Sequence, residues 1–125
     1  MILDTVALSA VLEGNPSIQR ALKAQDRHQI PAIALGEYRF GLVRSKQRHV
    51  LEPLLDRLED QSEVLEVGGD TARAYASLRD RLRAAGTPIA ENDLWIAALA
   101  IEHGQPILSL DEHFDHVKGV RRVSW

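Results

Sequence analysis

The chain contains no cysteine, which excludes disulfide bonds, thiolate metal sites and cysteine nucleophiles. Aromatic residues make up only 5% of the sequence, and its longest uninterrupted apolar run covers residues 94–101. That run is far shorter than the ~20 residues that cross a bilayer. The first residues show no basic segment followed by an apolar stretch, so we expect no secretory signal. These absences favour a cytoplasmic protein without a membrane segment.

What is present is typical of a globular domain. The 125 residues are 45% hydrophobic and 26% charged, close to the averages for soluble proteins, and we expect one domain over residues 1–125 because two would each be too small. The net charge of −3 argues against a surface that binds duplex DNA by charge alone. If four of the acids were gathered in one metal site, the rest of the chain would carry a net charge of +1. A phosphate substrate would then contact the cation rather than the carboxylates.

Short apolar segments alternate with helical patterns along the chain. Strands are predicted at residues 2–3, 30–34, 64–67, 107–110 and 120–123. Helices are predicted at residues 5–13, from 16 to about 26, from about 35, around 50–58, at 70–85 and at 93–103. Strands separated by helices imply right-handed crossovers and a mostly parallel sheet covered on both faces. The expected fold class is α/β, a three-layer α/β/α sandwich.

Polar and glycine residues mark several expected helix ends. Asn15 precedes a proline and predicts the start of the second helix. Asp70 is predicted to cap the fifth helix, and Asn92 is suited to cap the sixth. Gly104 is predicted to end that sixth helix, whose apolar sequence indicates that it is covered on most sides.

Four acidic residues are placed where such a sheet binds ligands. Asp4 and Asp111 directly follow predicted strands, Glu37 lies in the expected first turn of a helix that follows a strand, and Asp93 begins the apolar helix. Ligands of open parallel sheets bind beyond the carboxyl ends of the strands. We therefore expect the four acids at one edge, although 33, 56 and 18 residues separate them in sequence.

Four carboxylates in one crevice need a compensating charge or protons. At ~5 Å and an effective dielectric constant of ~20, each pair repels by about 3 kcal/mol. An all-oxygen site suits Mg²⁺ or Mn²⁺, which activate water and stabilise a phosphoryl group during displacement. A purely structural interpretation stays open, because aspartate is common in turns and Asp93 is favoured at a helix start by the helix dipole.

The same positions carry a resemblance to a known family. In order, spacing and total length, four stretches resemble the PIN-domain family, in particular the VapC-type toxins of bacterial type II toxin–antitoxin pairs. These are residues 1–5 (MILDT), 34–38 (ALGEY), 92–100 (NDLWIAALA) and 107–114 (ILSLDEHF). Each motif alone is weak, and together they cover essentially the whole chain.

The resemblance implies a Mg²⁺- or Mn²⁺-dependent endoribonuclease on a Rossmann-like sheet, held inactive by a cognate antitoxin. Asp4 and Asp93 are then the principal metal ligands, and Asp111 is the fourth acid and a further ligand. Glu37 orients or deprotonates the attacking water. The implied chemistry is attack of water on an RNA phosphodiester, which leaves a 5′-phosphate. A homodimer is also expected, and whether the site holds one ion or two stays open.

Further roles follow from the same resemblance. Thr5 would support Asp4 through its hydroxyl group, and Asn92 would donate a hydrogen bond from outside the metal shell. Asp115 is the alternative to Asp111 as the fourth acid. Arg39, two residues beyond Glu37, is the candidate contact to RNA phosphates. Val6 departs from the small polar residue that the family often has there, which removes a minor hydrogen bond.

Other interpretations remain to be distinguished. The residues Asp111, His113, Asp115 and His116 could form a zinc site, whereas the isolated His28, His49 and His103 are expected to be solvated. The aromatic residues Tyr38, Phe40 and Trp95 are expected in the core or at a subunit interface rather than under RNA bases.

Two other functions compete with the ribonuclease. One is a catalytically silent PIN-fold binding module, against which the presence of all four acids argues. The other is a phospho-acceptor receiver domain, which needs an aspartate after a central strand and a lysine after a late one. Asp56 instead falls within a predicted helix, and Lys118 follows a predicted loop.

Overall fold

The computed structural model describes residues 1–24 and 27–125. Its strands form one sheet in the order β3-β2-β1-β4-β5, and every pairing is parallel. The strands are β1 (Ile2–Leu3), β2 (Gln29–Pro31), β3 (Glu63–Leu65), β4 (Ile107–Leu108) and β5 (Arg122–Val123). Because the strands are parallel, all their carboxyl ends lie at the same edge of the sheet.

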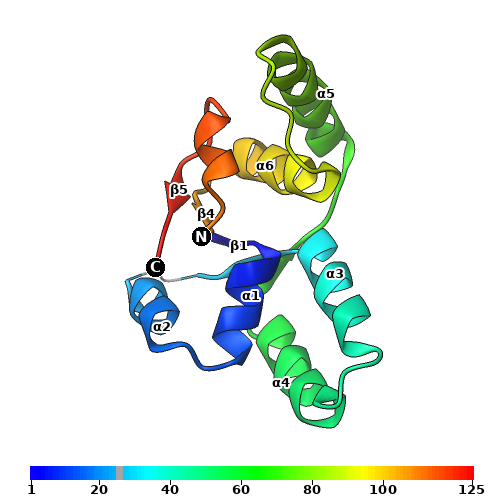
Figure 1. Cartoon of the computed structure of the whole chain (residues 1–125), viewed down its shortest axis with the longest axis vertical. Coiled ribbons are helices and arrows are strands. Elements are labelled where there is room, and N and C mark those ends of the chain that lie inside the picture. Colours follow the sequence, from blue (N-terminus) through cyan, green and yellow to red (C-terminus); the bar gives the residue numbers. More distant parts are fainter. Residues whose placement is uncertain (25–26) are drawn as a thin grey trace.

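Helices cover both faces of this sheet, which confirms the expected α/β/α sandwich. The helices are α1 (Thr5–Leu12), α2 (Pro16–Lys23), α3 (Ala32–Leu42), α4 (Arg48–Asp60), α5 (Gly69–Ala84), α6 (Glu91–His103) and the short 3₁₀ helix η1 (Glu112–His116). Helices α5, α6 and η1 lie on one side, and α1 to α4 lie on the other (Figure 1). Among the described residues, no helix combines the length and apolar character needed to cross a membrane.

The core explains why such short strands are stable. Successive side chains of a strand point to opposite faces. Ile2 and Ile107 accordingly pack into the cluster beneath α5 and α6, whereas Leu3 and Leu108 pack into the cluster beneath the other helices. All four side chains are fully buried. A strand that is buried on both faces has a continuous apolar sequence, as expected for a parallel sheet.

The predicted strand at 30–34 is shorter in the structure, because α3 begins at Ala32 directly after Pro31. Proline suits the position before a helix, since it has no N–H and the first N–H groups of a helix lack partners within it. The apolar residues that follow suit a buried helix as well as a buried strand. As a consequence, Glu37 lies in the second turn of α3 and not in its first turn.

Two predicted helix caps are wrong. Helix α5 begins after Gly68, whose N–H donates to the Thr71 hydroxyl at 3.0 Å, so Asp70 lies within the first turn. Helix α6 begins after Ala90 without a side-chain cap, so Asn92 is an exposed first-turn residue. In both cases the backbone turns into the helix earlier than the polar side chain indicated.

The remaining boundaries differ by a few residues. The predicted strands at 64–67, 107–110 and 120–123 shorten or shift to β3, β4 and β5. Helix α2 ends at Lys23, and its predicted end near residue 26 lies outside the described residues. Gly104 ends α6 as predicted, with a left-handed φ of 62° that a residue with a side chain rarely adopts.

Candidate active site

Asp4 is a buried carboxylate at the carboxyl end of the central strand. It caps α1, because its Oδ1 accepts a hydrogen bond from the N–H of Ala7 at 2.7 Å. Its side chain is only 4% exposed. Burial raises its pKa, and the negative charge of Asp111 raises the pKa further, while hydrogen bonds from the Ser109 hydroxyl and from Ala7 act in the opposite direction.

Asp93, in the first turn of α6, lies where the negative charges converge. Burial, followed by the charges of Asp111, Asp4 and Glu37, raises its pKa to about 6. His113 opposes this effect. Since these charges act on Asp93 only when they are near it, the fold brings acids from four distant parts of the sequence into one neighbourhood. This is the arrangement expected from the strand ends.

Asp111 follows β4 and begins η1. Its N–H donates to the Ser109 hydroxyl at 2.9 Å, and its own Oδ1 accepts from the N–H of His113 at 2.8 Å. The Nδ1 of His113 lies 3.2 Å from the same oxygen. Ser109 is fully buried, and its hydroxyl group also acts to lower the pKa of Asp4, so it lies near both acids. Ser109 was not among the predicted site residues, although a lone hydroxyl residue within an apolar strand segment is a usable signal.

Glu37 approaches the other acids from α3. The starts of α3 and α6 lie near each other, on the right in Figure 1, and Glu37 follows in the second turn of α3. Glu37 also lines a cleft of about 380 Å³ between α1 and α3, together with Thr5, Val6 and Tyr38. The candidate site therefore continues from the acids into a cleft with largely apolar walls.

The four acidic side chains lie near one another, but in their present conformations they do not surround a common metal position. Among residues 1–24 and 27–125, no three histidine or acidic side chains converge closely enough to hold one ion. Asp4 and Asp111 each direct one oxygen to an N–H group of the helix that follows. The all-oxygen donor set and its mutual repulsion suit a hard divalent cation, which Asp93 and Asp111 would reach by turning about their side-chain bonds.

Asp115 lies apart from this group. Both of its carboxylate oxygens accept hydrogen bonds from Arg122, at 2.9 and 2.8 Å, and this contact lowers its pKa. Of the two candidates for the fourth acid, only Asp111 acts on Asp4 and Asp93. The pairing with Arg122 also removes Asp115 from the alternative zinc cluster, which the described residues do not assemble.

The remaining predicted site residues have other surroundings. Arg39 is held by α4, with its Nη2 2.9 Å from Asp56 and 2.5 Å from Glu59, so an RNA phosphate would compete with two carboxylates. Asp56 lies inside α4 rather than at a strand end, which contradicts the receiver-domain alternative. Thr5 lines the cleft, and its expected support of Asp4 stays a prediction.

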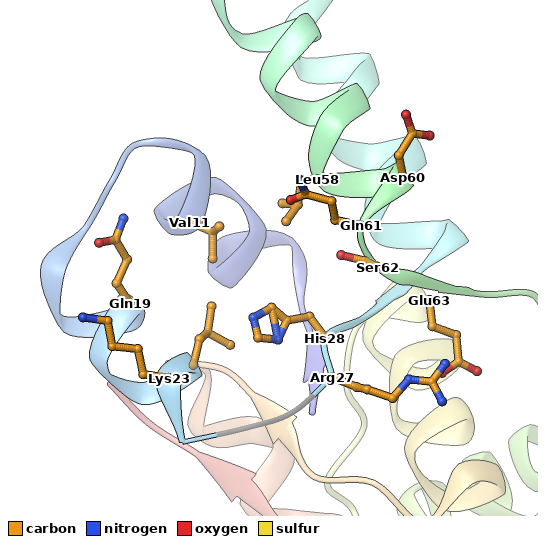
Figure 2. A pocket seen from close by; sticks show the side chains of 11 residues that line it. Val11, Gln19, Lys23, Arg27, His28, Leu58, Asp60, Gln61, Ser62 and Glu63 are labelled. Carbon is orange, nitrogen blue, oxygen red and sulfur yellow. The ribbon is translucent and has the colours of Figure 1, made fainter.

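A larger hollow of about 790 Å³ lies at the amino ends of β2 and β3, away from the four acids. Figure 2 shows the His28 imidazole pointing into it between Val11 and Leu58. His28 is half-buried, contrary to the expectation of a solvated histidine, and burial lowers its pKa. Charge pairs such as Arg27 with Glu63 at 3.1 Å line the rim. None of the four acids lines this hollow, so the reactive groups lie elsewhere despite its size.

Comparison with known proteins agrees with this geometry. The PIN domain family model matches residues 1–120. Ribonuclease VapC5 of Mycobacterium tuberculosis is 32% identical over 124 residues, which cover 98% of this chain and 90% of that protein. Ribonuclease VapC4 of the same organism is 32% identical over 97 residues, which cover 76% of this chain and 75% of that protein.

Solved structures show the same relationship. The crystal structure of VapBC-5 from Mycobacterium tuberculosis, a member of the VapBC family of toxin–antitoxin systems, superposes with a TM-score of 0.80 at 31% identity and covers 99% of this chain and 97% of its own. VapBC2 from Rickettsia felis, bound to a promoter DNA fragment, has a TM-score of 0.90 at 23% identity over 99% and 97% of the two chains, which shows the fold alone. The chain belongs to the PIN-domain family and, within it, to the VapC toxin–antitoxin ribonucleases.

Proposed function

We propose that this VapC-family ribonuclease is a Mg²⁺- or Mn²⁺-dependent endoribonuclease whose reaction is carried by Asp4, Glu37, Asp93 and Asp111. The observation that supports it is the Asp93 carboxyl group, whose pKa rises to about 6 under burial and the charges of the other three acids. In this site the charges of three acids act on Asp93 and His113 is the one basic residue that opposes them, so the site gains from a bound cation. Strongly shifted carboxyl groups of this kind cluster at reactive sites.

Asp4, Asp93 and Asp111 are the residues that would hold the cation. A cation bound there would neutralise their repulsion and stabilise the charge on a phosphoryl group. Glu37, on the cleft side of the site, orients a water molecule toward the phosphodiester and accepts its proton. Ser109 accepts a hydrogen bond from the Asp111 backbone N–H and favours the charged form of Asp4.

The partners follow from the family. We propose that a cognate antitoxin protein binds the chain and suppresses its activity, and that the chain acts as a homodimer in the cytoplasm. The structural relatives support the antitoxin, since they are described as VapBC complexes. A catalytically silent binding module remains the second candidate, and the absence of a ready ligand shell is the observation that favours it.

The first test is RNA cleavage. With Mg²⁺ or Mn²⁺ the purified chain is expected to cut RNA, and Asp93→Asn is expected to lower the rate on the order of a hundredfold or more. Asp115→Asn is the matched control, because that carboxylate pairs with Arg122 outside the site. Cleavage by Asp93→Asn at the wild-type rate would remove Asp93 from the mechanism, and an inert wild-type chain that still binds RNA would favour the silent module.

The cation itself is tested without RNA. Because a ligand that binds only the folded chain stabilises it, millimolar Mn²⁺ is expected to raise the melting temperature of the wild type. It should raise that of Asp93→Asn much less, and that of Asp115→Asn as much as the wild type. Differential scanning fluorimetry compares the melting temperature of each protein in buffer with Mn²⁺ and in the same buffer with EDTA in place of Mn²⁺. Equal shifts in all three proteins would place the cation elsewhere.

A further inference from the structure

The cleft between α1 and α3 has a chemistry that the acids alone do not explain. Its walls are formed by Thr5, Val6, Ser9, Glu37, Tyr38, Gly41 and Leu42. They contain no lysine or arginine, so the cleft offers nothing to a phosphate, and Glu37 repels one. The exposed Val6 and the half-buried Tyr38 ring instead provide apolar surface, and the hydroxyl groups of Thr5, Ser9 and Tyr38 provide hydrogen-bonding atoms. An uncharged planar group fits these walls.

The size of the cleft restricts what can enter. An α-helix with its side chains is about 10–12 Å across, so two turns would need roughly 1000 Å³, and the cleft has about 380 Å³. An extended peptide would need partners for its backbone N–H and C=O groups, and the walls are two helices rather than a strand edge. A single heterocyclic base needs neither the volume nor a sheet edge.

The cleft is also next to the site, because Glu37 belongs to both and Thr5, which lines the cleft, directly follows Asp4. Val6 is 56% exposed there, although it lies only two residues after the buried Asp4. A nucleotide whose phosphate lies at the acids would therefore have a neighbouring base within reach of the cleft. We propose that this cleft, defined by the seven residues above, binds one unstacked nucleobase of the RNA next to the scissile phosphate, with the Tyr38 ring as its stacking surface.

This inference rests on the proposed ribonuclease function and narrows its substrate. A base that enters the cleft must leave its stack and its pairing partner, which costs least in a loop or single strand. The chain therefore selects single-stranded RNA and rejects the same sequence in a duplex. Binding of one stacked base contributes on the order of tenfold in affinity.

Gly41 allows a test that leaves the fold intact. A Cβ added there meets nothing within 4 Å, and Gly41 has no left-handed backbone. Gly41→Leu would fill the cleft while improving the helix propensity of α3. Two controls match it. Gly41→Ala adds little volume, and Gly36→Leu makes the same change at another open position of the same helix, which does not line the cleft.

The experiment measures binding and cleavage of a single-stranded octanucleotide by each variant. Fluorescence anisotropy is recorded for the intact RNA and for versions with one abasic nucleotide at each position in turn. For the wild type, one abasic position is expected to weaken binding about tenfold. Gly41→Leu is expected to weaken the intact RNA by a similar factor, to raise KM with little change in kcat, and to lose all sensitivity to that abasic position. Both controls should stay within about twofold of the wild type.

The outcomes separate this inference from the proposed function. Cleavage by Gly41→Leu with wild-type KM, or additive effects of Gly41→Leu and the abasic site, would overturn the base-binding cleft and leave the ribonuclease standing. A wild-type chain that cuts no RNA would overturn the proposed ribonuclease activity. The anisotropy measurements would still show whether the cleft binds a base. Loss of self-association in Gly41→Leu with unchanged RNA binding would assign the cleft to a second copy of the chain and would also overturn the inference.

Discussion

At the scale of single residues, the Asp93 carboxyl group shows how placement changes chemistry. It is half-buried and faces three other acids, so its pKa rises to about 6, whereas Asp115, which is paired with Arg122, has a lowered pKa. Both are aspartates near a helix start, and nothing in their immediate sequence separates them. The difference comes from which charges surround each one.

The raised pKa of Asp93 predicts a pH dependence of stability. Its pKa is about 6 in the folded chain against an ordinary value of 3.8, so the folded chain binds more protons within that window. The free energy of unfolding therefore falls as the pH rises from about 4 to 6. Without divalent cations, Asp93→Asn is expected to stabilise the chain by about 1 kcal/mol at pH 7.5, after allowance for the exposure of the group.

Urea denaturation in EDTA at several pH values checks this prediction. The gain should shrink toward zero well below the ordinary value of 3.8, where the wild-type carboxyl group is protonated in both states. Asp115→Asn, which removes a carboxylate with the opposite pKa shift, is not expected to stabilise the chain at pH 7.5. A lower stability of Asp93→Asn at neutral pH would contradict the assignment of Asp93 to a repulsive cluster.

At the scale of elements, helix starts and ends set the positions of the acids. Asp4 caps α1, and Asp93 lies in the first turn of α6 without capping it. The stacked rings of Tyr75 and Trp95, 3.8 Å apart, join α5 to this part of α6, and the Tyr75 hydroxyl also bonds Glu91 in the first turn of α6. Glu37 and Asp93 thus lie within helices, whereas Asp4 and Asp111 lie in the short connections that lead from β1 into α1 and from β4 into η1.

Glycine substitutions are expected to have opposite effects at two positions. Gly104 ends α6 with a left-handed φ of 62°, so Gly104→Ala is expected to destabilise the chain by about 1 kcal/mol. Gly41 lies within α3 in an ordinary conformation with open space around it, so Gly41→Ala is expected to stabilise it by about 0.5–1 kcal/mol. Chemical denaturation of the two variants beside the wild type measures both, and equal signs would contradict these backbone assignments.

At the scale of the whole molecule, apolar side chains remain exposed in α3, in the connection after it and in α4. Phe40 is 82% exposed, Val43 is 54% exposed and Val50 is 52% exposed. Phe40 was expected in the core or at a subunit interface. Because its side chain is exposed, it does not lie in the core, and the interface stays a prediction. Among these three residues, the exposed phenylalanine is the largest apolar side chain that self-association could bury.

The homodimer is tested at Phe40. Light scattering after size exclusion is expected to give twice the 13.9 kDa mass of the chain, and Phe40→Asp is expected to shift it toward the monomer, because association would bury an unpaired charge. Val67→Asp is the control, since Val67 is also exposed, at 43%, but lies between β3 and α5. A wild-type monomer at high concentration would contradict the dimer, and a fully dimeric Phe40→Asp would move the interface elsewhere.

The order of strands and helices, and the placement of Asp4 and Asp111 after strands, were determined by the sequence alone. Apolar periodicity and turn residues act over a few neighbours and can be read locally, although this left the start of α3 ambiguous and displaced the caps of α5 and α6. Only the tertiary structure decided that Asp111 rather than Asp115 acts on Asp93, that Arg39 is held by α4, and that a cleft opens beside Glu37. Those properties depend on distances between groups far apart in the chain, and electrostatic coupling follows distance in space rather than separation in sequence.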